Sequence, residues 1–225
     1  MAVVVVGGHS RNVGKTSVVA GIIAGLRERQ WTAMKITQFG HGFCTADGAP
    51  CDCATDEHTI AFSAERDPTT GTDSARYLAA GAVKSLWVRT RQGNLAAAMP
   101  RIRKEIEAAE NAIIESNSVM HFLRPDLYLT VLDRGTADFK ASARLFLDRA
   151  DAVLLHAAKL RPHWNGVSLL LIEGKPQFGI APPHYVTEEI LDFVRSRIGP
   201  GVSLEAATTD ESLLRPASVS PGTAE

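Results

Sequence analysis

The sequence lacks any apolar run near the roughly 20 residues that a membrane-spanning helix needs. Its apolar start, residues 2–6, is too short for a signal peptide and follows no basic region. Charge of one sign is also lacking, because 24 lysines and arginines nearly balance 25 aspartates and glutamates. This balance favours neither nucleic acid nor a membrane as a partner. With three cysteines, which cannot all pair, a disulfide framework is disfavoured, and we expect a cytoplasmic protein.

The chain has 225 residues, of which 45 % are hydrophobic, enough for one α/β domain. Residues 2–7 form a β-branched run typical of a buried parallel strand, and a helical pattern follows over 15–29. Further strands are expected near 32–37, 83–88, 111–116, 127–132, 152–156 and 167–172, and further helices near 73–82, 94–110, 140–150 and 187–198. This alternation predicts a three-layer α/β fold with a doubly wound, mostly parallel sheet of about seven strands.

We expect this domain to span residues 1–204, with a polar, cysteine-containing loop inserted at 38–72. The chain beyond residue 205 is rich in Ala, Ser, Thr and Pro, which predicts a disordered tail over 205–225.

A glycine-rich segment, Gly8-His9-Ser10-Arg11-Asn12-Val13-Gly14-Lys15-Thr16, joins the first strand to the first helix. It is one residue longer than the common P-loop, because Gly8 lies six residues before Gly14. Such a loop can turn its amides, a lysine and a hydroxyl toward phosphates and Mg²⁺. The alternative is a glycine turn before a helix that happens to carry Lys-Thr. We expect the nucleotide to be bound by Gly8, Asn12, Val13, Gly14, Lys15, Thr16 and Ser17.

The spacing Gly-x5-Gly-Lys-Thr resembles the modified P-loop of the dethiobiotin synthetases and their relatives. Those relatives include the molybdopterin-guanine dinucleotide biosynthesis protein B family. Lys35, which closes the second strand in Met34-Lys35-Ile36-Thr37-Gln38-Phe39-Gly40, is similar to a lysine of the synthetases. The segment from Thr72 to Ala82 resembles a stretch of the protein B family, and Asp73 is its expected helix N-cap.

This resemblance implies a P-loop nucleoside-triphosphatase that uses ATP or GTP with Mg²⁺ in cofactor biosynthesis. Lys35 would face an unidentified small-molecule or protein acceptor, and a homodimer is plausible by analogy. Two alternatives stay open: a dethiobiotin synthetase-like ATP-dependent ligase, and a metal-binding protein that uses nucleotide hydrolysis as a switch.

A second acidic centre follows the strand near 111–116, which ends in Glu115. In P-loop enzymes an acidic residue at a strand end often reaches Mg²⁺. We therefore expect Thr16 and Glu115 to hold Mg²⁺, and Lys15, Lys35 and Glu115 to act in catalysis. The alternative for Glu115 is an ordinary exit from a strand. Asn117, two residues on, could contact substrate or phosphate.

All three cysteines, Cys44, Cys51 and Cys53, lie within ten residues, flanked by His41 and His58. Thiolates and imidazoles at this density could hold Zn²⁺ or an iron–sulfur centre, although the spacing is not that of a standard finger or ferredoxin. Free cysteines are more often small buried hydrophobic residues. The cluster could also face the acceptor.

Overall fold

The computed structural model describes residues 1–39, 59–156, 164 and 166–199. In chain order the helices and strands are β1 (Val3–Gly8), α1 (Lys15–Gly25), η1 (Arg27–Arg29), β2 (Trp31–Phe39), β3 (Ile60–Ala64), α2 (Asp73–Ala80), β4 (Lys84–Arg91), α3 (Leu95–Glu107), β5 (Asn111–Glu115), η3 (Ser118–His121), β6 (Leu127–Asp133), α4 (Ala141–Leu145), η4 (Leu147–Arg149), β7 (Ala152–His156), η5 (Leu169–Leu171), β8 (Gln177–Ile180) and α5 (Glu188–Ile198).

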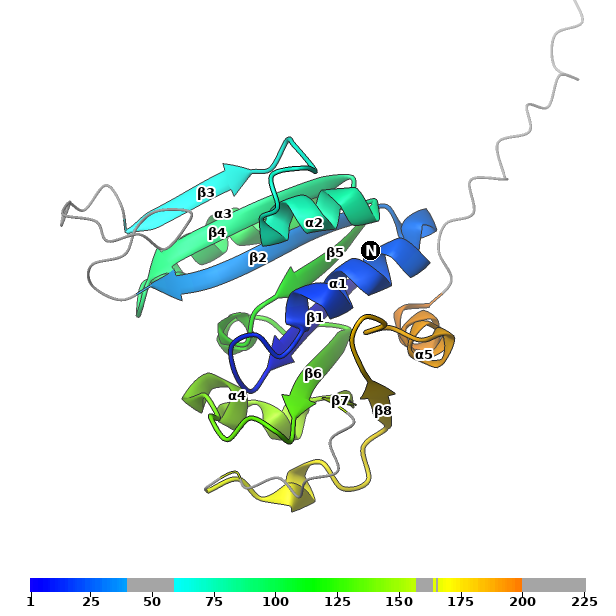
Figure 1. The fold of residues 1–225 in the computed structure, drawn as a ribbon. Helices are drawn as coiled ribbons and strands as arrows, with labels where there is room; N and C mark the ends of the chain where they lie inside the picture. Colours follow the sequence, from blue (N-terminus) through cyan, green and yellow to red (C-terminus); the bar gives the residue numbers. More distant parts are fainter. Residues whose placement is uncertain (40–58, 157–163, 165, 200–225) are drawn as a thin grey trace, which may run out of the picture.

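Eight strands among the described residues form one sheet in the order β3-β4-β2-β5-β1-β6-β7-β8 (Figure 1). Every neighbouring pair is parallel except β3 and β4, which are antiparallel. The expected doubly wound α/β fold is confirmed, with one strand more than the seven expected. The first strand, β1, lies inside the sheet, so the loop that follows it opens at the carboxyl edge of parallel strands.

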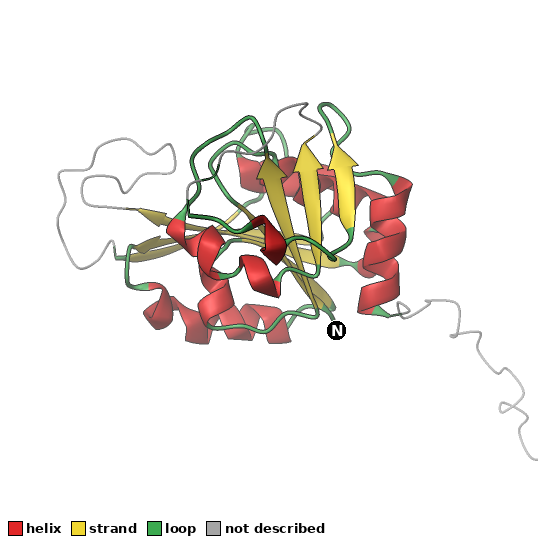
Figure 2. Cartoon of the chain, turned by 90° about the horizontal axis from the view of Figure 1, so that it is seen from below, coloured by secondary structure: helices red, strands yellow, loops and turns green. Residues whose placement is uncertain are grey.

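Helices cover both faces of the sheet (Figure 2). The alternation of side chains along β1 explains how, since Val4 and Val6 point to one face and Val5 to the other. The first face packs against α1, α2 and α5, and the second against α3, η3 and the residues Phe146 and Ala150 that flank η4. Both faces of the central strands are therefore buried, which is why these strands read as continuous apolar runs.

The ends of the helices follow local chemistry. Thr72, not Asp73 as expected, is the N-cap of α2, because its hydroxyl accepts a hydrogen bond from the Ala75 amide at 3.1 Å. Asp73 is the first helical residue, and its carboxylate forms an ion pair with Lys35 of β2. Thr187 caps α5 as expected, and the two glutamates that follow it suit the helix dipole.

Three expected segments differ from the structure. Residues 167–172 were expected to form a strand, but Leu169–Leu171 form the 3₁₀ helix η5 and the strand follows at 177–180. A short apolar run alone does not distinguish the two. Part of the expected loop 38–72 is the strand β3, which pairs with β4 at the sheet edge. The helix expected at 140–150 is divided into α4 and η4.

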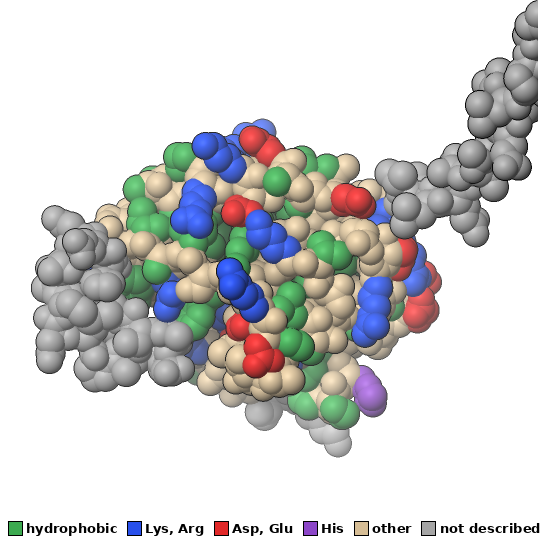
Figure 3. Space-filling view, turned by 90° about the horizontal axis from the view of Figure 1, so that it is seen from above, with side chains coloured by type: hydrophobic (Ala, Val, Ile, Leu, Met, Phe, Trp, Pro, Cys, Tyr) green, Lys and Arg blue, Asp and Glu red, His purple; other side chains and the backbone are tan. Residues whose placement is uncertain are grey.

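Acidic and basic side chains are interspersed on the face seen from above in Figure 3, in line with the balanced composition. In the part of the chain that is described, no helix is both long and apolar enough to cross a bilayer. Cys44, Cys51 and Cys53 lie outside the described residues, as does the expected tail at 205–225.

Candidate functional site

The loop between β1 and α1 turns sharply at Gly14, the residue before the helix. Gly14 has a φ of 89°, in the left-handed region that disfavours residues with a Cβ. A Cβ at this position would also lie 2.3 Å from the ring of Tyr185. A glycine is required at this position by both backbone conformation and space.

The beginning of the loop is held by Asn117, which follows β5. Its side-chain oxygen accepts from the Gly8 amide and its amide nitrogen donates to the Gly8 carbonyl, both at 2.8 Å. Gly7 leaves room for this side chain, because a Cβ there would lie 2.3 Å from the Asn117 oxygen. Asn117, which the sequence offered as a residue that could contact substrate or phosphate, instead forms both of these hydrogen bonds with the loop backbone.

His9 fixes the loop to the segment after β6. Its Nε2 accepts from the Asp133 amide at 2.9 Å, so Nδ1 carries the proton and donates to the Asp138 carbonyl at 2.7 Å. Its ring stacks on Phe139 and also contacts Trp164. Burial lowers the pKa of His9, which keeps the imidazole neutral. His9 thus has a structural role in shaping the loop.

Hydrogen-bond donors of the loop remain available for a ligand. The amides of residues 12–16 donate to no acceptor among the described residues, as is usual at a helix N-terminus. The Lys15 ammonium donates to the Ser10 carbonyl across the loop at 2.8 Å. Burial lowers the pKa of Lys15 to about 8, partly offset by the charge of Glu115. These groups make a cationic, donor-lined site suited to an anion.

The carboxylate of Glu115 lies beside this loop. It accepts from the Thr16 hydroxyl at 2.7 Å and also from the Tyr77 hydroxyl of α2. Burial, together with the negative charge of Glu115, raises the pKa of Tyr77, which therefore stays a protonated donor. Glu115 is only 5 % exposed, and a buried carboxylate needs hydrogen-bond donors or a positive charge nearby. The Thr16 and Tyr77 hydroxyls supply two such donors.

Lys35 joins the same cluster from the middle of β2, which continues to Phe39, so it does not close this strand as expected. Its ammonium lies 3.3 Å from the Glu115 carboxylate and 3.4 Å from the Thr16 hydroxyl, and it forms a short ion pair with Asp73. The structure therefore brings together Lys15, Thr16, Lys35 and Glu115, all of which were singled out from the sequence.

Oxygen ligands for Mg²⁺ are available in this cluster. Mg²⁺ in nucleotide sites typically takes one or two protein oxygens and completes its shell with phosphates and water. The Thr16 hydroxyl and the Glu115 carboxylate, 2.7 Å apart, fit this requirement. Within the described ranges, no three His, Cys, Asp or Glu side chains gather as a metal site of their own.

Sequence reasoning missed two members of the cluster, Asp73 as a partner of Lys35 and Tyr77 as a partner of Glu115. Both come from α2, and their i,i+4 spacing places them on one helical face. That spacing was a usable signal. Tyr185, which covers Gly14, gave no signal, because it comes from the distant segment between β8 and α5.

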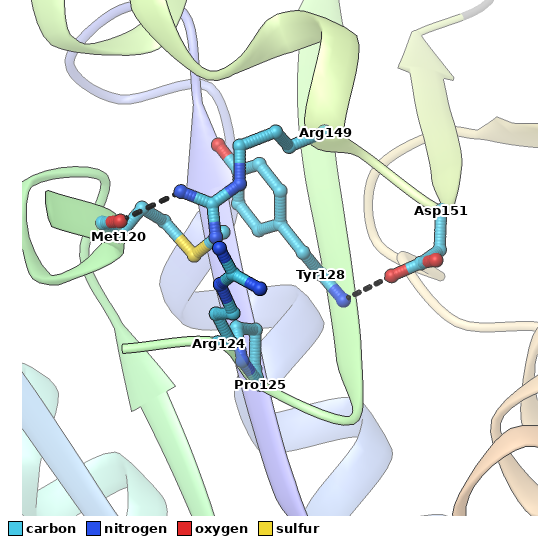
Figure 4. Close-up of a pocket in the computed structure, with 6 residues that line it drawn as sticks. All are labelled: Met120, Arg124, Pro125, Tyr128, Arg149 and Asp151. Carbon is cyan, nitrogen blue, oxygen red and sulfur yellow. Dashed lines mark hydrogen bonds between the residues drawn. The ribbon is translucent and has the colours of Figure 1, made fainter. Parts of the chain in front are cut away.

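A separate pocket of about 490 Å³ lies near the start of β6 and β7 (Figure 4). Its polar groups are largely bonded to the protein itself. Arg149 donates to the Met120 and Leu123 carbonyls, and Asp151 accepts from the Tyr128 amide. The buried Tyr128 hydroxyl, by contrast, has no hydrogen-bond partner among the described residues.

No protein-family model and no curated protein sequence matches the chain. Among solved structures, HypB from Helicobacter pylori in complex with nickel is 14 % identical over 86 % of this chain and 83 % of that chain, with a TM-score of 0.43. LpxK from Aquifex aeolicus in complex with ATP is 18 % identical over 80 % of this chain and 53 % of that chain, with a TM-score of 0.42.

Proposed function

We propose that the protein binds ATP or GTP with Mg²⁺ in the loop from Gly8 to Ser17 and transfers the γ-phosphoryl group. One observation carries this proposal. Three kinds of group lie together at the carboxyl edge of a parallel sheet. They are the backbone amides before α1 that have no acceptor among the described residues, the Lys15 ammonium, and the oxygens of Thr16 and Glu115. No other class of ligand uses this combination as well as a polyphosphate with its metal.

Each residue has a distinct role in this proposal. The loop amides of Asn12, Val13 and Gly14 bind phosphate oxygens, and Lys15 leaves the Ser10 carbonyl to bind the β- and γ-phosphates. Thr16 and Glu115 hold Mg²⁺, which neutralises charge on the phosphates when bound.

In hydrolysis, a water oxygen attacks the γ-phosphorus and the bond to the β–γ bridging oxygen breaks. The nucleoside diphosphate leaves, and one proton is released to solvent. Lys35, which is held by Asp73 and Glu115, would stabilise negative charge on the transferred group.

The resemblance noted in the sequence extends the proposal to cofactor biosynthesis, as in the molybdopterin-guanine dinucleotide biosynthesis protein B family. The position of Lys35 also supports a second candidate, transfer to an acceptor as in a dethiobiotin synthetase-like ligase. A homodimer, and Zn²⁺ or iron–sulfur binding at Cys44, Cys51 and Cys53, stay predictions, as does the switch function built on that metal.

Titration calorimetry with Mg·ATP and Mg·GTP, paired with a phosphate-release assay, tests the proposal. Lys15→Ala should lower turnover by about 100-fold or more, because it removes a preorganised charge from the transition state. The exposed Lys104 on α3 supplies the control, and Lys104→Ala should leave both readouts unchanged. Equal affinity and turnover in the wild type and Lys15→Ala would refute the proposal.

A further inference from the structure

In the part of the chain that the structure describes, one face of β2, β4 and β3 continues past α2 without a helix over it (Figure 1). The strand register places Lys35 beside Trp87 and Thr37 beside Arg89, while Ser63 of β3 lies on the other side of Trp87. These five half-exposed residues, here called the β4 platform, share the sheet face that carries the phosphate cluster.

The residues of the β4 platform hold one another in place. The Trp87 indole donates to the Thr37 hydroxyl at 2.9 Å, and the Arg89 guanidinium lies over the indole ring at 4.8 Å. Arg89 also donates to the Ser63 hydroxyl at 2.6 Å. The guanidinium is thus fixed by neutral groups, which orient it without neutralising its charge.

Arg89 has unused binding capacity. It forms no ion pair with any described residue, and its buried Nε has no hydrogen-bond acceptor there. Burial lowers the pKa of its guanidinium. A buried donor without a partner calls for an explanation, and a bound anion supplies one.

We propose that the β4 platform binds a small molecule through its carboxylate or phosphate group, with Arg89 as the anion ligand. The strand neighbours of Arg89 lead directly to Lys35, one row along the sheet at a distance of roughly 7 Å. A molecule anchored at Arg89 therefore extends toward Lys35 and the γ-phosphate. Its role as the phosphoryl acceptor rests on the proposed function, whereas its binding does not.

The test uses the full chain saturated with Mg²⁺ and a non-hydrolysable ATP or GTP analogue, so that the loop is filled. Succinate and glycerol 3-phosphate are then titrated separately, with neutral glycerol as a third probe. Trp87 is the reporter, because it is half-exposed while Trp31 and Trp164 are buried. We expect saturable quenching by at least one of the two anions and none by glycerol.

Arg89→Gln should weaken this binding at least tenfold, and Arg89→Lys should weaken it less. Arg101 supplies a matched control, since its guanidinium lies 4.2 Å from the Phe62 ring centroid and Phe62 packs against the opposite face of the sheet. Arg101→Gln should bind like the wild type. Arg89→Lys carries the test should Arg89→Gln fail to fold.

Three results would overturn the inference. Neither anion quenches Trp87 fluorescence, glycerol quenches it as strongly as the anions do, or the anions quench it equally in the wild type and the Arg89 variants. Failure of the analogue itself to bind refutes the proposed function instead. In that case the same anion titration, run without nucleotide, still decides whether the β4 platform binds anions.

Discussion

If the loop binds a nucleotide as proposed, the lowered pKa of Lys15 should make the affinity depend on pH. Because burial lowers this pKa to about 8, a substantial part of the ammonium is neutral in the free protein above pH 8. A bound polyphosphate favours the charged form, so binding draws a proton from solvent. Affinity is therefore fully present below the pKa of the free protein and is lost as pH rises through it.

The size of the effect follows from the fraction of charged lysine. With a pKa of about 8, roughly 90 % of the ammonium is charged at pH 7 and roughly 10 % at pH 9. The dissociation constant for Mg·ATP or Mg·GTP should consequently rise about tenfold over this interval. The phosphates themselves add little to the pH dependence of the dissociation constant, because a terminal phosphate has its second pKa at about 6.

Calorimetry in two buffers of different ionisation enthalpy measures the affinity and the proton uptake together. At pH 8.5 we expect uptake of a proton on binding, falling toward zero at pH 6.5. Lys15→Arg should flatten the profile, since a guanidinium stays charged throughout. A wild-type profile without slope, or an equal slope in Lys15→Arg, would refute this reasoning.

Two further predictions concern the shape of the site. Gly14→Ala should abolish nucleotide binding and lower the melting temperature. A left-handed backbone costs a non-glycine residue about 1–2 kcal/mol, and the clash of the new Cβ with Tyr185 adds to this cost. Scanning calorimetry with and without nucleotide measures both effects, and an unchanged variant would contradict the loop geometry. Tyr77→Phe should cost about 1–3 kcal/mol in urea unfolding, because Glu115 loses a buried donor; no change would mean that this contact contributes nothing.

Much of the central architecture was predictable because it rests on local patterns. The β-branched run before a glycine loop and Lys-Thr predicts β1, the loop and α1 together. Glu115 was predictable because it ends a buried strand, where ligands bind in parallel sheets. Lys35 was singled out as the end of its strand, but it lies in the middle of β2 and reaches the cluster because it is the register partner of Glu115.

The remaining features depend on contacts between distant segments. The contact of Tyr185 with Gly14 joins residues far apart in the chain, and no hydrophobic periodicity in the sequence predicts it. The apolar residues 167–172 satisfy the pattern of a buried strand equally well, although the structure forms a 3₁₀ helix there. The edge strand β3 was missed because its half-exposed residues carry a weaker signal than a central strand.

A crystal structure with Mn²⁺ in place of Mg²⁺ and a non-hydrolysable nucleotide analogue would test the central claim most directly. We predict phosphate oxygens within hydrogen-bond distance of the amides of residues 12–16, the Lys15 ammonium on the β- and γ-phosphates, and the anomalous metal signal beside Thr16 and Glu115. A nucleotide bound elsewhere, with this loop empty and Lys15 still on the Ser10 carbonyl, would contradict the assignment.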